Sequence, residues 1–313
     1  MIVSRALDPL PLEGCPAAVV SIGVFDGVHL GHQAILSTNV RQAAERGARP
    51  TVVTFRGHPK AVLLGHAPRT LTTLEHRLEL FRRAGISHTL VLAFDEYLRD
   101  TSAEKFTREI LVEKLGAEHF VLGFDSKFGR GREGGPELLR ELGYPVEVVP
   151  KVEVDQRGVS SSAIREAVEL GDLEGAARML GRPVAVFGEV VHGQNLGGEL
   201  GFPTANLDLH HELHPPTGVY ACHARLARGS GDARSTHPAV ANIGFRPTVE
   251  GRSRREPLVE VHLLDFSGDL YGQLLELEFV TRLRGERRFE SQGALRAQIA
   301  EDVARARDLL GLA

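Results

Sequence analysis

Cysteine is scarce in this 313-residue chain, where only Cys15 and Cys222 occur, far apart and without a C-x-x-C spacing. That count excludes a disulfide framework or a zinc ribbon and is typical of a reducing cytoplasm. The chain also lacks a signal-like apolar segment at its start and any apolar run near the ~20 residues that span a bilayer. We therefore expect a cytoplasmic protein with no membrane partner.

An excess of positive charge is missing as well. The chain has 37 Lys and Arg against 41 Asp and Glu, a net charge of −4 and a pI near 6.4. This balance argues against a general nucleic-acid binder. The remaining composition is that of an ordinary globular protein, and the length is enough for roughly two domains.

The segment 23–33 (GVFDGVHLGHQ) follows an apolar run at 17–22 and precedes a stretch of helical apolar spacing that stops at Gly47. This pattern predicts a strand, a turn and a helix. Backbone amides and the positive end of the helix dipole converge at such a turn, which suits an anionic phosphate. His29 and His32 could stabilise charge on a phosphate during its transfer. The alternative is a tight turn with two exposed histidines.

Strand-like and helix-like segments alternate from residue 50 to residue 181. Strands are expected at 51–55, 86–94, 119–124 and 144–154 and helices at 73–83, 101–116 and 136–142, and two short helices follow the serines of 159–165 and end at Gly171 and Gly181. Thr101 and Glu104 resemble a capping box at the start of their helix. The order predicts parallel β-α-β units, whose ligands gather beyond the carboxyl ends of the strands. The turn at 23–32 and the segments 55–59 and 124–129 would share that edge.

Two further segments of this half suit phosphates. The string 129–134 (GRGREG) matches G-x-G-x-x-G, but it begins several residues after the strand. A mobile basic loop over a phosphate, lined by Lys127, Arg130 and Arg132, is therefore favoured over a nicotinamide site. The serines of 159–165 (VSSSAIR) can cap a helix or bind phosphate oxygens, and Arg165 offers a bidentate guanidinium. A plain helix cap with a surface arginine is the alternative.

The periodicity changes beyond residue 181, where extended segments follow one another without helices, at 185–191, 218–227, 237–243, 257–266 and 274–283. Short strands punctuated by Gly and Pro predict a small closed antiparallel barrel. Residues 291–310 then predict a helix with one apolar stripe.

Two parts of this second half carry candidate chemistry. The string 197–206 (GGELGFPTAN) offers backbone amides for phosphates, and Thr204 and Asn206 add oxygen ligands that suit Mg²⁺. Glu260 and His262 leave one face of an expected strand, so Glu260 could act as a general base if it points into the barrel mouth. An ordinary turn and a solvated carboxylate are the alternatives.

Four strings of the first half, at 23–32, 55–59 (FRGHP), 123–129 (GFDSKFG) and 160–165 (SSSAIR), together resemble the adenylyltransferase module of the bacterial bifunctional riboflavin kinase/FMN adenylyltransferases. The second half resembles the riboflavin kinase module of the same family, through strings at 188–193, 200–206, 242–248, 260–266, 269–272 and 288–289. The resemblance covers nearly the whole chain.

For residues 1–182 the resemblance implies a Rossmann-like α/β parallel-sheet nucleotidyltransferase domain. It would transfer AMP from ATP to FMN and release FAD and pyrophosphate. His29 and His32 would stabilise the α-phosphate. The further residues implied are nucleotide-binding Gly23, Phe25, Asp26, Gly31, Ser160, Ser161, Ser162 and Arg165, and flavin-binding His58, Asp125 and Phe128.

For residues 183–313 the resemblance implies a small antiparallel β-barrel domain with a C-terminal helix, which phosphorylates riboflavin to FMN. Thr204 and Asn206 would bind Mg-ATP, and Glu260 would activate the ribityl 5′-hydroxyl. Nucleotide binding is also implied for Gly188, Gly193 and Gly201. The expected substrates are riboflavin, FMN and ATP, with no nucleic acid or membrane involved.

Three departures from the family pattern bear on function. Ser126 stands where an aromatic residue is usual, Ser162 where threonine is usual, and Gly198-Glu199 where an arginine is usual. Two other functions therefore stay open. One is a nucleotidyltransferase with a single active module, and the other is a flavin- or nucleotide-binding regulator without turnover, which would need no base at Glu260.

Overall fold

A computed structural model describes residues 1–5, 14, 16–192, 201–209, 212–226, 236–245 and 257–312. The chain divides into two compact units, Met1–Ser161 and Ser162–Ala313. The division falls after the first residue of helix α7 (Ser161–Leu170), so the rest of α7 and helix α8 (Leu173–Leu180) lie between it and the domain boundary expected after residue 182. By its contacts α8 belongs with the second unit, where it packs on strand β14.

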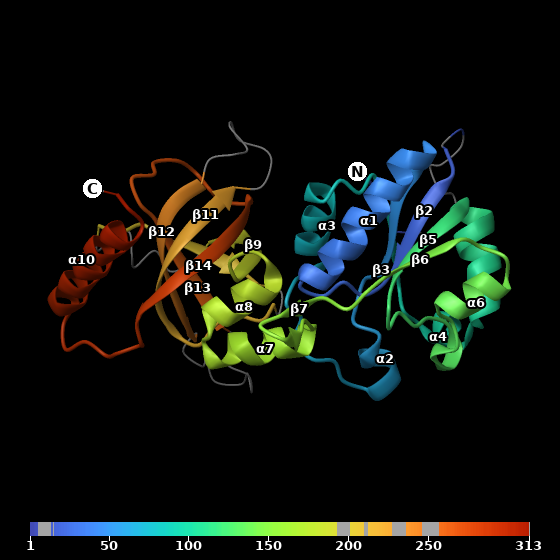
Figure 1. Cartoon of the computed structure of the whole chain (residues 1–313). Coiled ribbons are helices and arrows are strands. Elements are labelled where there is room, and N and C mark those ends of the chain that lie inside the picture. Colours follow the sequence, from blue (N-terminus) through green and yellow to red (C-terminus); the bar gives the residue numbers. More distant parts are fainter. Residues whose placement is uncertain are drawn as a thin grey trace. The chain divides into compact units, whose positions relative to one another are not determined.

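The described part of the first unit contains a six-stranded sheet in which every neighbouring pair is parallel (Figure 1). Its order is β1-β4-β3-β2-β5-β6, with β3 and β4 on one side of β2 and β5 and β6 on the other. The loops that follow β2 and β5 therefore meet at the point where the strand order reverses, which is where ligands bind in open α/β sheets. The strands are β1 (Ile2–Ser4), β2 (Ala18–Ile22), β3 (Arg49–Phe55), β4 (His88–Leu92), β5 (Ala117–Gly123) and β6 (Val146–Val149).

Helices cover both faces of this sheet. On one face α1 (Leu30–Arg46) and α3 (Leu74–Arg83) pack on apolar residues such as Val52 and Val121. The other face packs on four helical segments, which are α4 (Glu96–Asp100), α5 (Ala103–Lys105), the π-helix η1 (Phe106–Lys114) and α6 (Pro136–Glu141). Burial on both faces explains why the strands are nearly continuous apolar runs in the sequence.

The expected helix at 101–116 forms, but its capping box is wrong. The Thr101 hydroxyl donates to the Tyr97 carbonyl at 2.7 Å, at the end of α4. Ser102 is the N-cap of α5 instead, and its Oγ accepts from the Lys105 amide at 3.2 Å. The hydroxyl that the sequence pattern assigned to the cap is thus hydrogen-bonded to the preceding helix instead.

The glycine-rich string 129–134 contains the short 3₁₀ turn η2 (Arg130–Arg132) rather than a strand-to-helix turn. Phe128 and Gly134 pair through both of their backbone groups, at 3.2 and 2.9 Å, and the Arg130 amide donates to the Thr101 carbonyl at 2.8 Å. These bonds fasten the string to the end of α4. This local structure is not the strand-to-helix turn of a dinucleotide fingerprint.

The second unit is a closed antiparallel barrel of strand order β10-β13-β12-β11-β14-β9 in the part that the structure describes. Its strands are β9 (Ala185–Val191), β10 (Ala205–Asp208), β11 (Gly218–Leu226), β12 (Thr236–Phe245), β13 (Pro257–Leu263) and β14 (Leu274–Arg284). All were expected except β10. The helix α10 (Gln292–Leu309) begins after its N-cap Ser291 and packs on the outer wall of the barrel through Val303 and Ala306.

The absence of long apolar runs and the scarcity of cysteine can both be followed in the structure. None of the helices that the structure describes is both long and apolar enough to cross a membrane. Cys222 is a free cysteine buried in the barrel, and burial raises the pKa of its thiol. Cys15 lies outside the described residues.

A short helix and a short hairpin complete the described part of the first unit. The helix α2 (Lys60–Leu64) follows β3 and has no buried residue. The strands β7 (Glu153–Val154) and β8 (Arg157–Gly158) form a hairpin whose turn residues, Asp155 and Gln156, both have positive φ. This hairpin leads directly into the serine string at the start of α7.

Candidate functional sites

The turn between β2 and α1 brings His29 and His32 together. Their imidazole rings stack with centroids 3.6 Å apart and planes inclined by 17°. His29 is the N-cap of α1, and its Nδ1 accepts from the His32 amide at 3.4 Å. The Phe25 ring meets the His32 ring edge-on at 5.1 Å. Both imidazoles are therefore held at the positive end of α1, where an anion is stabilised.

The backbone of this turn is strained and close-packed. Phe25 and Val28 have φ values of +54° and +39°, which are uncommon for residues other than glycine. A Cβ at Gly31 would lie 3.2 Å from Cε1 of His29, and one at Gly23 would lie 3.0 Å from the Phe25 ring. Glycine at these two positions leaves room for the rings. Positive φ values at residues other than glycine, such as those of Phe25 and Val28, cluster at functional sites.

Asp26, which the resemblance assigned to nucleotide binding, has its carboxylate directed into the segment before α3. Its Oδ1 accepts from the amides of Leu71 and Thr72 at 2.9 and 3.1 Å. Thr72 Oγ1 accepts in turn from the Gly27 amide at 2.9 Å, and the Ser161 hydroxyl donates to the Asp26 carbonyl at 3.0 Å. This network fixes the shape of the histidine turn from within the first unit.

His58 and Asp125 lie just beyond the carboxyl ends of β3 and β5. His58 is half-buried, and its Nδ1 accepts from the Lys60 amide at 3.2 Å. Asp125 is exposed, two residues after the end of β5. The sheet order thus brings the histidine turn and both segments to one edge, as the alternating pattern predicted.

Ser126 and Phe128 take internal roles in the segment after β5. The Ser126 hydroxyl accepts from the Gly123 amide at 3.0 Å, which closes the turn. Phe128 is 8% exposed, and its ring packs against Phe106 at 5.9 Å, within the core of the first unit.

The serine string leads into α7. Ser160 precedes the helix and Ser161 begins it, whereas Ser162 and Arg165 follow in the second compact unit. Ser160 and Ser162 are exposed, and Arg165 is half-buried. Hydroxyls at a helix start and a guanidinium one turn later match the arrangement that the sequence predicted.

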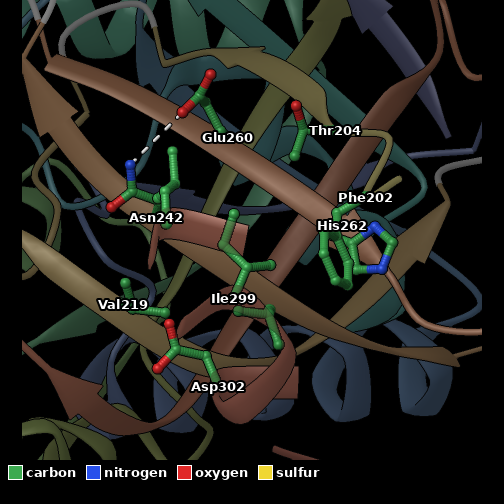
Figure 2. A pocket seen from close by; sticks show the side chains of 10 residues that line it. Phe202, Thr204, Val219, Asn242, Glu260, His262, Ile299 and Asp302 are labelled. Carbon is green, nitrogen blue, oxygen red and sulfur yellow. Dashed lines mark hydrogen bonds between the residues drawn. The ribbon is translucent and has the colours of Figure 1, made fainter. Parts of the chain in front are cut away.

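In the second unit a cavity of about 240 Å³ lies between the outer wall of the barrel and α10 (Figure 2). Figure 2 shows Glu260 and Thr204 together at one end, Asp302 at the other, and Ile299 of α10 between them. Asn242, opposite Glu260 on β12, directs its Nδ2 to Glu260 Oε2 at 3.5 Å. Apolar side chains line much of the remaining wall, namely Phe202, Val219, Val240, Leu295 and Ile299.

Glu260 faces outward, not into the barrel mouth that the sequence analysis considered. Val259 and Val261, on the opposite face of β13, are fully buried and fill the interior. Glu260 and His262 therefore face α10, because successive side chains of a strand leave on opposite faces. Closure of a small barrel around apolar side chains leaves no room for a polar site inside it.

Asn206 lies opposite Glu260 in the β10–β13 pair, so their side chains leave the sheet on one face. His262 Nδ1 contacts the Pro203 carbonyl at 2.8 Å, which holds the segment before β10 against β13. The hydroxyl, amide and carboxylate oxygens of Thr204, Asn206 and Glu260 thus come from neighbouring positions of the outer wall.

Asp302 is a cavity residue that sequence reasoning missed. It is 5% exposed, and Nε of Arg284 donates to both of its oxygens at 3.1 and 3.0 Å. Gln298 Nε2 adds a third bond at 3.0 Å. The sequence hinted at its burial only through its position next to Val303, which belongs to the apolar stripe of α10. This ion pair fastens α10 to the end of β14.

The three glycines expected at the kinase nucleotide differ in setting. A Cβ at Gly188 would lie 2.2 Å from the Asp208 carbonyl, so the close approach of β9 and β10 requires glycine. Gly201 is exposed, with a φ of +87°. Gly193 lies outside the described residues, as does the departure at Gly198.

Stacked imidazoles at a helix start and a carboxylate over a barrel-wall cavity are both suited to phosphate chemistry. One lies in an α/β unit and the other in a β-barrel unit. Together they define a two-unit class of nucleotide-dependent transferases.

Comparison with known families identifies the class more closely. The family model described as FAD synthetase matches residues 13–163, and the one described as riboflavin kinase matches residues 180–310. The chain belongs to the bifunctional riboflavin kinase/FMN adenylyltransferase family.

Similar proteins match over nearly their full lengths. A bifunctional riboflavin kinase/FMN adenylyltransferase of Pseudomonas fluorescens is 42% identical, with 95% of this chain and 93% of the relative covered. One of Escherichia coli strain K12 is 38% identical, with 98% and 96% covered. A crystal structure titled as a macrolide-efflux protein from Streptococcus pneumoniae has a TM-score of 0.80 and 29% identity, covering 98% of both chains. Neither matching family model describes an efflux protein.

Proposed function

We propose that this chain converts riboflavin to FAD in two ATP-dependent steps, phosphorylation to FMN in the second unit and adenylylation of FMN in the first. The observation that carries the proposal is that His29 and His32 stack in one compact unit and Glu260 overlooks a cavity in the other. Each unit is matched by a different family model.

In the adenylylation step, a phosphate oxygen of FMN attacks the α-phosphorus of ATP. A new P–O bond forms there as the bond to the β-phosphate oxygen breaks, and pyrophosphate leaves. His29 and His32, at the positive end of α1, stabilise the charge that develops on the α-phosphate. Ser161, which begins α7 and is the last residue of this unit, is assigned to the departing pyrophosphate.

In the phosphorylation step, Glu260 accepts the proton of the ribityl 5′-hydroxyl while that oxygen attacks the γ-phosphorus of ATP. The bond from the γ-phosphorus to the bridging oxygen breaks, and ADP leaves. The apolar wall between the barrel and α10 suits the flavin ring. Neither step needs a covalent protein intermediate, because positioning and charge stabilisation dominate phosphoryl transfer.

The donor set near Glu260 fits a magnesium ion that is shared with a nucleotide. Among the described residues no three His, Cys, Asp or Glu side chains group as metal ligands. Thr204 and Asn206 offer neutral oxygens, and Mg²⁺ commonly takes few protein ligands together with phosphate oxygens and water. When bound, such an ion neutralises charge on the transferring phosphate. The use of ATP and the few cysteines support a cytoplasmic location.

The test is a time course of FMN and FAD formation from riboflavin, ATP and Mg²⁺. The double variant His29→Ala/His32→Ala should accumulate FMN and lose FAD formation by at least about 100-fold, the typical cost of removing a group that stabilises transition-state charge. Glu260→Gln should lose FMN formation by about 10²–10⁴-fold, the contribution of a general base, and still convert supplied FMN to FAD.

In each variant the activity of the unaltered unit serves as the control that the chain is folded. Loss of both activities in one folded variant would refute the assignment of separate sites. FMN as the sole product of the unaltered chain would favour a protein with one active module. Flavin binding without ATP consumption would favour a regulator.

A further inference from the structure

Arg77 of α3 is buried beneath the histidine turn. The residue is only 3% exposed. Nη1 donates to the Val24 carbonyl at 2.5 Å and lies 3.4 Å from Thr54 Oγ1, and Nη2 donates to the Phe55 carbonyl at 3.2 Å. A single guanidinium therefore joins the turn after β2 to the end of β3.

A buried guanidinium is costly unless its surroundings compensate it. Desolvation lowers the pKa of Arg77, and the nearby carboxylates of Asp26 and Glu75 partly offset that effect. The hydrogen bonds of its guanidinium end on two carbonyls and a hydroxyl, not on a carboxylate. The usual place for an arginine on an amphipathic helix is the solvent face, where this cost does not arise.

The contacts of Arg77 lie next to one of the two residues of the turn that have positive φ. Val24 immediately precedes Phe25, whose φ is +54°. On the other side of Phe25, the Asp26 carboxylate is held by the amides of Leu71 and Thr72. The short segment 71–77 thus holds the turn on both sides of Phe25. A residue with positive φ persists only when its surroundings over-determine it.

The same guanidinium also fixes the second loop at this edge of the sheet. Phe55 is the last residue of β3, and the chain continues from it to His58. The Gly23 amide donates to the Val53 carbonyl at 3.1 Å, which is the adjoining link between the two strands. Arg77 extends this link beyond the strand ends, into the loops that carry His29, His32 and His58.

We propose that Arg77 is a positioning residue for AMP transfer, which holds the Val24 and Phe55 carbonyls together and thereby sets the place of the imidazole pair. The inference rests on the proposed role of His29 and His32. Arg77 itself touches no reacting atom in this assignment and acts through the backbone.

The test compares Arg77→Met with Arg77→Lys in the full chain, with FMN adenylylation followed under saturating ATP. Arg77→Met should lower kcat about 10- to 100-fold with little change in KM, because a misplacement of about 1 Å costs on that order. Arg77→Lys keeps a donor for one of the two carbonyls but loses the planar fork that joins them, so it should recover only part of the activity that Arg77→Met loses. Riboflavin phosphorylation by the same molecules should be unchanged.

Hydrogen exchange supplies a readout besides activity. In Arg77→Met the amides of Gly27 and Val28 should exchange faster, whereas those of β2 and β3 should keep their protection. Arg83→Met is the matched control, because Arg83 lies on the same helix and its side chain pairs with Glu79 at 3.0 Å, away from the turn. It should change neither kcat nor exchange at the turn.

Wild-type kcat in folded Arg77→Met would overturn the proposal. Loss of protection throughout β2 and β3 would also overturn it, because Arg77 would then stabilise the sheet as a whole. The failure of the proposed function looks different. If His29→Ala/His32→Ala still transferred AMP, the catalytic role of the pair would fall, while the exchange experiment would still report whether Arg77 holds the turn.

Discussion

Two buried histidines of the first unit, His88 and His119, lie apart from the imidazole pair. His88 on β4 is 0% exposed, and its Nε2 lies 3.0 Å from the Ser4 hydroxyl of β1. Burial, with a smaller effect of Arg49, lowers its pKa from 6.5 to about 4. The pKa of His119 is also lowered, first by burial. Both side chains are therefore neutral in the folded chain at neutral pH.

The protonation of His88 makes stability depend on pH. In the unfolded chain His88 takes up a proton below about pH 6.5, but in the folded chain only near pH 4. The unfolded state binds more protons within this window, so the free energy of unfolding should fall as the pH falls from 6.5 towards 4. Urea unfolding followed by circular dichroism at several pH values measures this slope.

The variant His88→Gln isolates this contribution, because glutamine keeps a hydrogen-bonding side chain and does not titrate. It should be less stable than wild type near neutral pH, and the difference should shrink by roughly 1–2 kcal/mol between about pH 7.5 and about pH 5. Parallel pH profiles of the two proteins would mean that His88 titrates alike in the folded and unfolded chains.

Single residues were predictable to the extent that their chemistry is local. His29 and His32 were identified because a strand, glycines and a helix start surround them in the sequence. Arg77 and Asp302 were missed, because charged residues on amphipathic helices are ordinarily solvated and only packing reveals their burial.

Among the elements, the pair of β9 and β10 shows how backbone spacing controls the proposed kinase site. β10 has four residues, and it places Asn206 between Val191 of β9 and Glu260 of β13. A Cβ at Gly188 of β9 would lie only 2.2 Å from the carbonyl oxygen of Asp208. The position of Asn206 therefore depends on a glycine that need not touch a nucleotide.

Gly188→Ala should destabilise the second unit by about 1–3 kcal/mol, the usual cost of overpacking, because the obstacle is backbone and cannot rotate away. FMN formation should fall, while conversion of supplied FMN to FAD should be unaffected. Thermal unfolding and the two assays measure these effects.

Gly293→Ala is the matched glycine control in the same unit. Gly293 lies in the first turn of α10, is exposed, and has no atom nearer than 3.8 Å to a new Cβ. Alanine should be neutral there or stabilise by up to about 1 kcal/mol, since it is the better helix former. Equal effects of the two substitutions would contradict the steric explanation.

Elements were predictable where periodicity is strong, as in the buried strands of the sheet and the striped helix α10. β10 was missed because it is short and follows Pro203, so it resembles a loop until β9 and β13 are placed beside it. The helix over 101–116 was predicted, but not the π-helical form of η1 within it.

For the whole molecule, the important fact is the division into two compact units with separate candidate sites. Separate sites predict that FMN made in one unit is released and used by the other unit of a different chain. An equimolar mixture of His29→Ala/His32→Ala and Glu260→Gln should therefore form FAD from riboflavin, although neither variant does so alone. FAD should appear after a lag that shortens as the enzyme concentration rises.

Chromatography of the reaction over time follows FMN and FAD in this mixture. The control is each variant alone with its own permitted substrate, riboflavin for the first and FMN for the second. Absence of FAD in the mixture, with both controls active, would mean that FMN passes only within one chain.

The sequence by itself determined the alternation of buried strands and helices in the first unit, the paired imidazoles at a helix start and the face that Glu260 shares with His262, because these follow from local spacing. Only the tertiary structure decided that this face looks outward onto α10, that Asp302 closes the far end of the cavity, and that Arg77 lies beneath the histidine turn. Burial depends on which distant segments pack together. The periodicity of a single segment gives its two faces but not the partner that covers each one.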